Sequence, residues 1–372
     1  MDPAKKKRVL KMLAGREADR AQARELLVAL GDDALWREAL AGARTHTVVG
    51  IEQLRNDDLA LVAAAPDHLP EVRELRSRNR KMYFSSAVGE EASCLTHLDE
   101  VHLTAAWGSD APVFSPSLAL LHHNPVTILD LIGVDLGDGS LVAPFPLREL
   151  RGGNTKWSAL PVLPRLEVLT GHADATTLGA GLPALRRLEL AAAELSDLTA
   201  LAGATRLEEL TLTRAAAVRD LDPVRRAVAA GAPLREVRLL GARRVESLAP
   251  FAGAPLEHLE LEGVDLTDLS PLAGAARLRW LAVRDAPHLA ELSPVAKLPA
   301  LQCLDLRGCS AVRDLSPALA LPALRVLALR GTGVAPADVP AALRPYCTWA
   351  DTPVLERLAD RPRHPDDTRE AA

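Results

Sequence analysis

The sequence repeats the pattern L-x-x-L-x-L at a nearly constant spacing, and this repeat limits the possible folds more than any other feature of the chain. Seven strong copies begin at residues 185, 207, 234, 256, 278, 301 and 324, spaced 22, 27, 22, 22, 23 and 23 residues apart. Weaker copies begin near residues 98, 126, 147 and 166. A short period of this kind is typical of a solenoid, in which each repeat buries its apolar face against its neighbours.

Each repeat is predicted to contain a strand, a turn and a short helix. The alternation L-x-L is typical of a short strand with one buried face. After it, Ser270-Pro271, Ser293-Pro294 and Ser316-Pro317 occupy equivalent positions. A serine N-cap followed by proline starts a short helix or 3₁₀ turn. The fold class that follows is an α/β solenoid of about ten or eleven stacked repeats with parallel strands.

The repeats resemble the leucine-rich-repeat family, in its short, 22–23-residue bacterial type of internalins and SDS22-like proteins. The copy that matches best runs from Leu256 to Leu272. The resemblance implies a curved solenoid and says little about function. One position departs from the family, because the asparagine that usually follows the strand is absent. Its position holds small or apolar residues: Ala193, Ala242, Val264, Ala286, Cys309 and Thr332. We therefore expect a less regular solenoid.

The chain divides into four predicted parts. Residues 1–92 show no repeat and have apolar residues at helical spacing, which predicts an α-helical N-terminal domain that caps the solenoid or docks a partner. Residues 93–334 form the leucine-rich-repeat solenoid, with irregular stretches at 104–125 and 147–180. Residues 335–358 form a C-terminal cap in which Tyr346, Trp349, Val354 and Leu355 cover the last leucine layer. Residues 359–372 are charged and predicted to be disordered.

Catalytic and cofactor motifs are missing from the sequence. It contains no phosphate-binding loop, zinc-protease or nucleophile-elbow motif, and its cysteines, at 94, 303, 309 and 347, form no CxxC pair. We expect no enzyme activity, no cofactor and no metal. An enzyme whose active site consists of residues without a recognisable motif is the alternative. If the protein were a ubiquitin ligase, Cys347 would have to be its reactive thiol, and an alkylating probe would test this.

Composition indicates a bacterial, cytoplasmic protein. The first 13 residues lack the apolar core of a signal peptide, and 37 of the 44 basic residues are arginine, which is typical of a high-GC genome. The basic run Lys5–Arg8 is interpreted as a solvated helix start. A pI of about 6.1 and 3% aromatic residues make nucleic acid an unlikely partner, and no apolar run is long enough to span a membrane.

The strand pattern predicts which side chains leave the core. In L-x-a-L-b-L-c, positions a, b and c face outward, on the surface that solenoids of this type make concave. The predicted partner-binding residues on this surface are Glu209, Glu236, Arg238, His258, Glu260, Glu262, Trp280, Arg284, Asp305, Arg307 and Arg330. Among them, four glutamates cluster in the middle, three arginines follow one edge, and an exposed Trp280 lies between. The alternative is an ordinary solvated surface of Glu–Arg pairs.

These features predict a non-catalytic protein–protein interaction module, such as a scaffold, adaptor or sensor, that binds a protein partner on the concave face within a hetero-complex. The alternative is a regulatory subunit of a bacterial enzyme or defence complex that docks through residues 1–92. An adhesin of the internalin kind is disfavoured, because the sequence shows no secretion signal.

Overall fold

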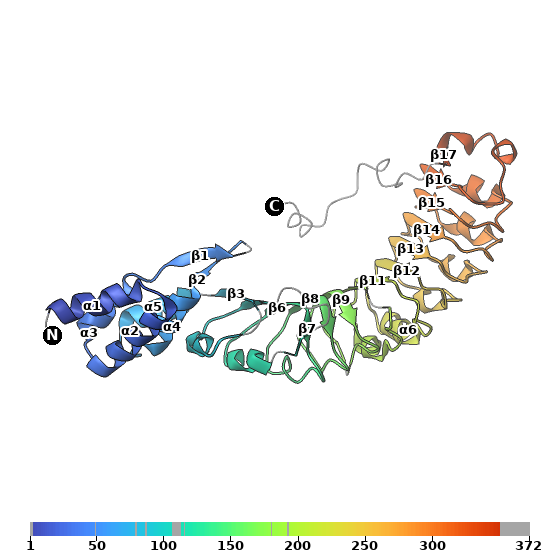
Figure 1. The fold of residues 1–372 in the computed structure, drawn as a ribbon. Coiled ribbons are helices and arrows are strands. Elements are labelled where there is room, and N and C mark those ends of the chain that lie inside the picture. Colours follow the sequence, from blue (N-terminus) through green and yellow to red (C-terminus); the bar gives the residue numbers. More distant parts are fainter. Residues whose placement is uncertain are drawn as a thin grey trace. The chain divides into compact units, whose positions relative to one another are not determined.

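The structure is a computed structural model of the 372-residue chain, and it describes residues 3–48, 50–78, 80–85, 88–105, 113–114, 116–179, 181–191 and 193–349. The chain forms two compact units, residues 1–185 and 186–372. Figure 1 shows helices at the start of the first unit, and in the second unit strands along one side with short helices along the other. No helix among the described residues has the length and apolar character needed to cross a bilayer.

The first unit begins with a small helical bundle that has its own apolar core. Its elements are α1 (Pro3–Leu13), α2 (Glu17–Leu30), α3 (Asp33–Leu40), β1 (Thr45–Val48), β2 (Ile51–Leu54), α4 (Asn56–Ala64) and α5 (Pro70–Arg78). Gly31 ends α2 in the left-handed conformation, with φ of 58°. Asp32 then caps α3 by accepting a hydrogen bond from the Leu35 backbone N–H at 3.1 Å. Leu27, Leu35 and Trp36 are buried between these helices.

The α-helical domain expected at residues 1–92 contains strands in two places, of which residues 51–54 had been predicted as helix. Residues 45–54 form an antiparallel hairpin, in which Val48 pairs with Ile51 and Gly50 has φ of 77°. Residues 81–85 form β3 (Lys81–Ser85), which pairs in parallel with β4 (Glu100–Thr104) and so belongs to the repeat sheet. Met82 and Phe84 are buried where leucines stand in later repeats. The leucine pattern could not reveal this strand.

The rest of the first unit contains irregular repeats. Its elements are η1 (Glu90–Cys94), β4, β5 (Val113–Phe114), η2 (Pro116–Leu121), β6 (Ile128–Ile132), β7 (Val134–Asp135), β8 (Glu149–Lys156) and β9 (Val168–Asp174). The β8–β9 pairing shifts register between Gly152 and Thr155. Gly171 has φ of 129°, and a Cβ built on it would lie 1.7 Å from the Gly152 carbonyl oxygen. Two backbones approach here at a distance that only glycine permits.

The second unit contains the regular repeats. Its strands are β10 (Arg187–Ala191), β11 (Glu209–Thr213), β12 (Glu236–Leu240), β13 (His258–Glu262), β14 (Trp280–Arg284), β15 (Cys303–Asp305), β16 (Val326–Ala328) and β17 (Cys347–Thr348). All pair in parallel with their chain neighbours, so that Leu259, for example, pairs with Leu281. The first seven strands begin at position a of the repeat, as predicted. The leucines between the outward positions are buried and form the core.

Short helices return the chain on the opposite side: η3 (Thr199–Gly203), α6 (Asp222–Ala229), η4 (Ala249–Phe251), η5 (Ser270–Leu272), η6 (Ser293–Lys297) and η7 (Ser316–Ala320). The predicted serine N-caps are wrong by one residue, because the N-cap is the leucine before the serine, such as Leu269 in η5 and Leu315 in η7. The side chain two positions earlier accepts the hydrogen bond from the first helical N–H, as Asp268 does from Ser270 at 2.7 Å and Asp314 from Ser316 at 2.8 Å. The serine and proline instead form the first helical turn.

The bend after each strand is built without the asparagine of the family. The residue before the asparagine position adopts a positive φ, from 51° at Asp285 to 75° at Gly308. Its backbone N–H donates to the end of the next strand, as Asp285 does to Arg307 at 2.9 Å. At the asparagine position itself, Cys309 donates through its thiol to the Val283 carbonyl. Backbone carbonyl groups of the next repeat thus accept hydrogen bonds that hold these bends in place.

The C-terminal part contains η8 (Pro336–Asp338), η9 (Arg344–Tyr346) and β17. Val339 and Leu343 are buried there. Tyr346 and Trp349, which we expected to cover the last leucine layer, are 40% and 37% exposed instead. Residues 350–372 lie outside the described residues, and so do the rest of the predicted cap and the predicted tail at 359–372.

Candidate functional site

The outward positions of β10–β16 form one continuous surface, called the concave face below. The register places Glu236, His258 and Trp280 side by side on β12, β13 and β14. One step along the same strands, it places Arg238, Glu260 and Ala282 side by side. Side chains about 5 Å apart across parallel strands can interact directly. The structure therefore brings most of the predicted site residues together.

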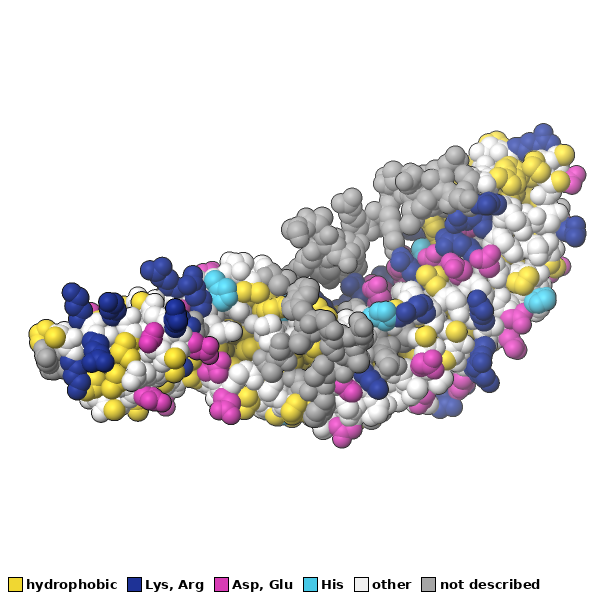
Figure 2. Space-filling model, in the orientation of Figure 1, with side chains coloured by type: hydrophobic (Ala, Val, Ile, Leu, Met, Phe, Trp, Pro, Cys, Tyr) yellow, Lys and Arg dark blue, Asp and Glu magenta, His cyan; other side chains and the backbone are white. Residues whose placement is uncertain are grey.

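The charged residues of this face pair with one another. Arg238 contacts Glu236 at 2.7 Å and Glu260 at 3.7 Å, and Arg284 contacts Glu260 at 2.7 Å. Arg284 also contacts Asp305 at 2.7 Å, as does Arg307. A chain of alternating charge thus crosses β12–β15. Figure 2 shows basic and acidic side chains interleaved on the second unit. The three arginines expected along one edge do not form a simple ladder, because Arg284 and Arg307 converge on one carboxylate.

Asp305 is the most buried member of this charge network, with 0% of its surface exposed. Its carboxylate accepts hydrogen bonds from the guanidinium groups of Arg284 and Arg307 and, at 3.2 Å, from the Arg307 backbone N–H. Burial alone would raise the pKa of Asp305, but the two guanidinium groups outweigh burial and hold the pKa below 3.8. Asp305 is therefore ionised at neutral pH and organises the arginine side of the face.

Glu260 is the centre of the network on β13. Its neighbour His258 and the guanidinium groups of Arg284 and Arg238 hold the pKa of Glu260 at about 2, against the effect of burial. Burial dominates for His258 and lowers the pKa of its ring below 6.5. His258 is consequently neutral at pH 7, while Glu260 keeps its charge.

Trp280 is buried rather than exposed, which corrects the expectation from the sequence. Only 8% of its surface is exposed. Its ring stacks on the His258 ring, with centroids 5.3 Å apart and an interplanar angle of 11°. Trp280 points outward from the sheet but is still buried, because neighbouring side chains on the same face of the strands cover one another.

Three buried nitrogens of this face make no hydrogen bond within the described residues. Arg238 Nε and His258 Nε2 lie 3.7 Å and 3.6 Å from the Glu260 carboxylate, and Trp280 Nε1 has no such neighbour. They come from β12, β13 and β14, which are adjacent strands. A buried donor without an acceptor costs about 1–3 kcal/mol. An oxygen acceptor supplied by a bound partner would remove part of this cost.

The remaining predicted residues lie at the edges of the network. Glu209 pairs with Arg187 at 2.8 Å, one strand before the network begins. Glu262 lies 3.8 Å from Arg284 and is 43% exposed at its side chain. Arg330 is exposed at position c of β16. Glu262 and Arg330 are more accessible to a partner than the central side chains, whereas Glu209 is no more exposed than Arg238.

The cysteine thiols do not have the character of nucleophiles. Burial raises the pKa of Cys303 and Cys347, and it raises the pKa of Cys309 to about 11. In the described part of the chain, no group of three or more His, Cys, Asp or Glu residues could hold a metal ion.

A second polar cluster, on the outward face of the first unit, was missed from the sequence. His102 on β4 contacts Glu100 at 2.9 Å and Asp130, on the neighbouring strand β6, at 3.2 Å. Lys81 on β3 also pairs with Glu100. The sequence did contain a signal for this cluster, because the weak repeats at 98 and 126 place His102 and Asp130 at the same outward position, position b.

Comparison with known proteins confirms the fold. No protein-family model matches the sequence, and no curated protein matches it at a significant level. Among solved structures, internalin InlF from Listeria monocytogenes is 18% identical, with 82% of each chain covered and a TM-score of 0.53. The leucine-rich-repeat domain of the type III effector XopL is 20% identical, with 82% of this chain and 91% of that chain covered and a TM-score of 0.36.

A leucine-rich-repeat protein from Leptospira interrogans is 16% identical, with 75% and 91% covered and a TM-score of 0.38. Only the internalin likeness has a TM-score above 0.5, and at this identity it concerns the fold alone. Together with the repeat register, it confirms the resemblance seen in the sequence: the chain is a leucine-rich-repeat solenoid of parallel strands that begins with a helical segment.

Proposed function

We propose that this protein is a non-catalytic interaction module, a scaffold, adaptor or sensor, that binds a protein partner on the concave face of residues 186–349. One observation carries the proposal: a chain of alternating charge crosses β12–β15 beside the buried Trp280 indole N–H, which has no hydrogen-bond partner among the described residues. Such a preorganised surface favours a partner with complementary charges and backbone carbonyl oxygens.

The balance of charge favours a protein over a nucleic acid. Four carboxylates on β12–β15 outnumber the three arginines of the network: Glu236, Glu260, Glu262 and Asp305 stand beside Arg238, Arg284 and Arg307. A phosphate backbone needs an excess of positive charge. The arginines here are already engaged by carboxylates.

The cell compartment and the assembly are inferred from the sequence and the thiols. Cys94, Cys303, Cys309 and Cys347 are all free, which is typical of a reducing compartment. Together with the arginine-rich composition, this supports a bacterial cytoplasm. A preorganised face without catalytic chemistry supports membership of a hetero-complex.

Partner capture by charge-swapped variants tests the proposal. Leu240 and Glu262 face each other in register on β12 and β13. The double variant Leu240→Glu with Glu262→Arg introduces a cross-strand ion pair at these positions, removes the 3.8 Å contact of Glu262 with Arg284, and so changes the surface that a partner meets. The matched control reverses Arg186 and Glu208, an ion pair at 3.0 Å just before the strands.

We expect a partner that co-purifies with the full-length protein to be retained by the Arg186→Glu, Glu208→Arg control. The concave-face variant should lose it by about tenfold, equivalent to about 1.4 kcal/mol. Equal capture by both variants would contradict the proposal. In that case, loss of the partner on altering α1–α5 would favour the alternative, a regulatory subunit that docks through its N-terminal helices.

A further inference from the structure

We propose that the edge of the sheet where β14–β16 begin is a second docking surface, which binds an acidic segment of a protein partner. The surface consists of the exposed Arg277, Arg279 and Arg325 and the half-buried Gln302, and it is called the basic edge below. These residues lie outside positions a, b and c of the repeats. The inference therefore goes beyond the function proposed for the concave face and does not depend on it.

The first observation is a row of residues that directly precede the strands of the second unit. The backbone N–H of each member donates to the carbonyl oxygen of its counterpart in the previous repeat. Glu208 donates in this way to Arg186 at 2.8 Å, and Arg325 donates to Gln302 at 2.7 Å. The row is thus continuous along the edge, and its members in chain order are Arg186, Glu208, Arg235, Glu257, Arg279, Gln302 and Arg325.

The charges of this row alternate along its first five members and then stop alternating. Arg186 forms an ion pair with Glu208 at 3.0 Å. The first unit contains the same kind of pair just before its strands β8 and β9, where Arg148 and Glu167 lie 2.8 Å apart. Gln302 stands where the next carboxylate of the row would be. The row therefore ends in two arginines with a neutral amide between them.

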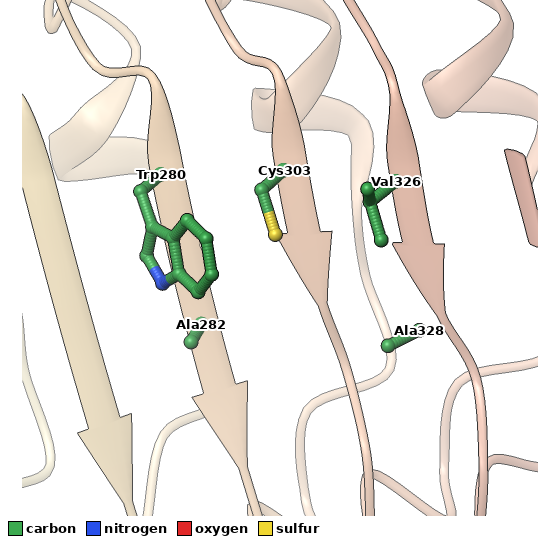
Figure 3. Packing of buried hydrophobic residues seen from close by; sticks show 5 residues of the cluster. All are labelled: Trp280, Ala282, Cys303, Val326 and Ala328. Atoms are coloured by element: carbon green, nitrogen blue, oxygen red, sulfur yellow. The ribbon is translucent and has the colours of Figure 1, made fainter. Parts of the chain in front are cut away.

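The second observation is that the adjacent outward positions supply no carboxylate at this end. Position a directly follows each member of the row, and on β10–β12 it holds the charged residues Arg187, Glu209 and Glu236. On β14–β16 it holds apolar residues of one buried cluster, which Figure 3 shows side by side: Trp280, Cys303 and Val326, together with Ala282 and Ala328. The arginines beside this cluster have no acidic neighbour at position a.

The arginines of the basic edge are unpaired. The side chains of Arg277, Arg279 and Arg325 form no ion pair or hydrogen bond with any residue in the described ranges. In the row, the carboxylate next to them is Glu257, one strand before Arg279. Three guanidinium groups thus share one flanking carboxylate, which leaves an excess of positive charge at this end.

This arrangement suits a carboxylate group supplied by a partner. Arg279 and Arg325 are two strand spacings apart, about 10 Å between their backbones, so their long side chains can converge on one carboxylate. A guanidinium group binds a carboxylate through two parallel hydrogen bonds, and the Gln302 amide between the arginines can donate another. Two arginines of the concave face already converge in this way on Asp305.

The order of charges along the row favours an acidic protein segment over a nucleic acid. A phosphate backbone binds best along an extended track of positive charge. Here Glu257 interrupts the track one strand before Arg279, and the alternation continues beyond it with Arg235 and Glu208. A short acidic stretch with a basic residue at one end is complementary to this order.

Restoring the alternation without removing an arginine tests the proposal. Gln302→Glu places a carboxylate between Arg279 and Arg325, as other carboxylates of the row stand between their arginines. A second variant, Arg279→Gln with Arg325→Gln, removes the positive charges themselves. The matched control is Arg186→Gln with Arg235→Gln, which removes two arginines from the alternating part of the same row.

The probe is a fluorescein-labelled peptide that carries four consecutive glutamates followed by a lysine. A peptide of equal length with glutamines in place of the glutamates reports binding that does not depend on charge, and an oligothymidine of eight nucleotides represents nucleic acid. Binding to the full chain is measured by fluorescence anisotropy at low ionic strength, where exposed charges are weakly screened. Circular dichroism confirms that every variant is folded.

We expect the acidic peptide to bind the wild-type chain and to bind about tenfold more weakly to Gln302→Glu and to Arg279→Gln, Arg325→Gln. The Arg186→Gln, Arg235→Gln control should keep the wild-type affinity. The proposal would be overturned if the wild-type chain did not bind the acidic peptide more tightly than the glutamine peptide, or if the control lost as much affinity as the other variants. Tighter binding of the oligothymidine, lost in the same variants, would also overturn it and identify a nucleic-acid surface.

Discussion

Replacing Asp305 by alanine should destabilise residues 186–349 by about 3 kcal/mol, because this carboxylate joins two arginines inside the concave face. Breaking a buried ion pair by removing one partner costs about 3–5 kcal/mol. Asp305 is fully buried, and the side chains of Arg284 and Arg307 are only 21% and 18% exposed. The lower end of the range applies, because Arg284 keeps its contact with Glu260 at 2.7 Å.

The assay is equilibrium denaturation of the full chain, with the free energy of unfolding extrapolated to water. Arg186→Ala removes an exposed pair with Glu208, which should cost less than about 1 kcal/mol, and serves as the control. A double-mutant cycle of Asp305→Ala and Arg307→Ala should give a coupling energy of about 2 kcal/mol. If Asp305→Ala costs no more than Arg186→Ala, the buried network does not stabilise the fold as argued.

Three further predictions concern the ionised clusters and the close backbone contact. The pKa of Glu260 is lowered from 4.5 in the unfolded chain to about 2 in the folded chain. The Glu260 carboxylate therefore contributes fully to the free energy of unfolding at a pH above 4.5, and this contribution is lost as the pH falls toward 2. The stability difference between wild type and Glu260→Gln should thus be constant above about pH 5 and shrink between pH 4.5 and about 2 in denaturation curves. Burial lowers the pKa of His102, but hydrogen bonds to Asp130 and Glu100 outweigh it and raise the pKa above 6.5. His102→Gln should therefore cost most below pH 6.5 and progressively less as pH rises through the raised pKa, and an opposite trend would refute the cluster. Gly171→Ala should cost about 3 kcal/mol, since its Cβ meets the Gly152 carbonyl, whereas Gly203→Ala, with open space around it, should be nearly neutral in the same assay.

The sequence predicted the regular strands because leucine repeats report burial directly. Leu259 and Leu281 had to face the core, and the strands around them begin where the pattern places them. The leucine pattern did not predict strand β3, because Met82 and Phe84 occupy the positions that leucines hold in later repeats. The hairpin at 45–54 was not predicted, because Ile51 and Leu54 also fit a helical spacing with Leu59 and Leu61.

The sequence indicated which residues share the concave face, but not how their side chains contact one another. Period-2 alternation placed Glu260, Arg284 and Asp305 on one face. It could not show that Arg284 and Arg307 turn toward the same carboxylate, since side-chain rotamers depend on neighbours from three strands. For the same reason, Trp280 was expected in solvent, whereas it packs on His258.

The central claim is that the concave face of residues 186–349 binds the partner. Hydrogen–deuterium exchange of the full chain, with and without the co-purified partner, tests it most directly. The account predicts slower exchange on partner binding in β13, β14 and β15, at residues 258–262, 280–284 and 303–305. Protection confined to α1–α5, with these strands unchanged, would contradict it and place the partner on the N-terminal helices.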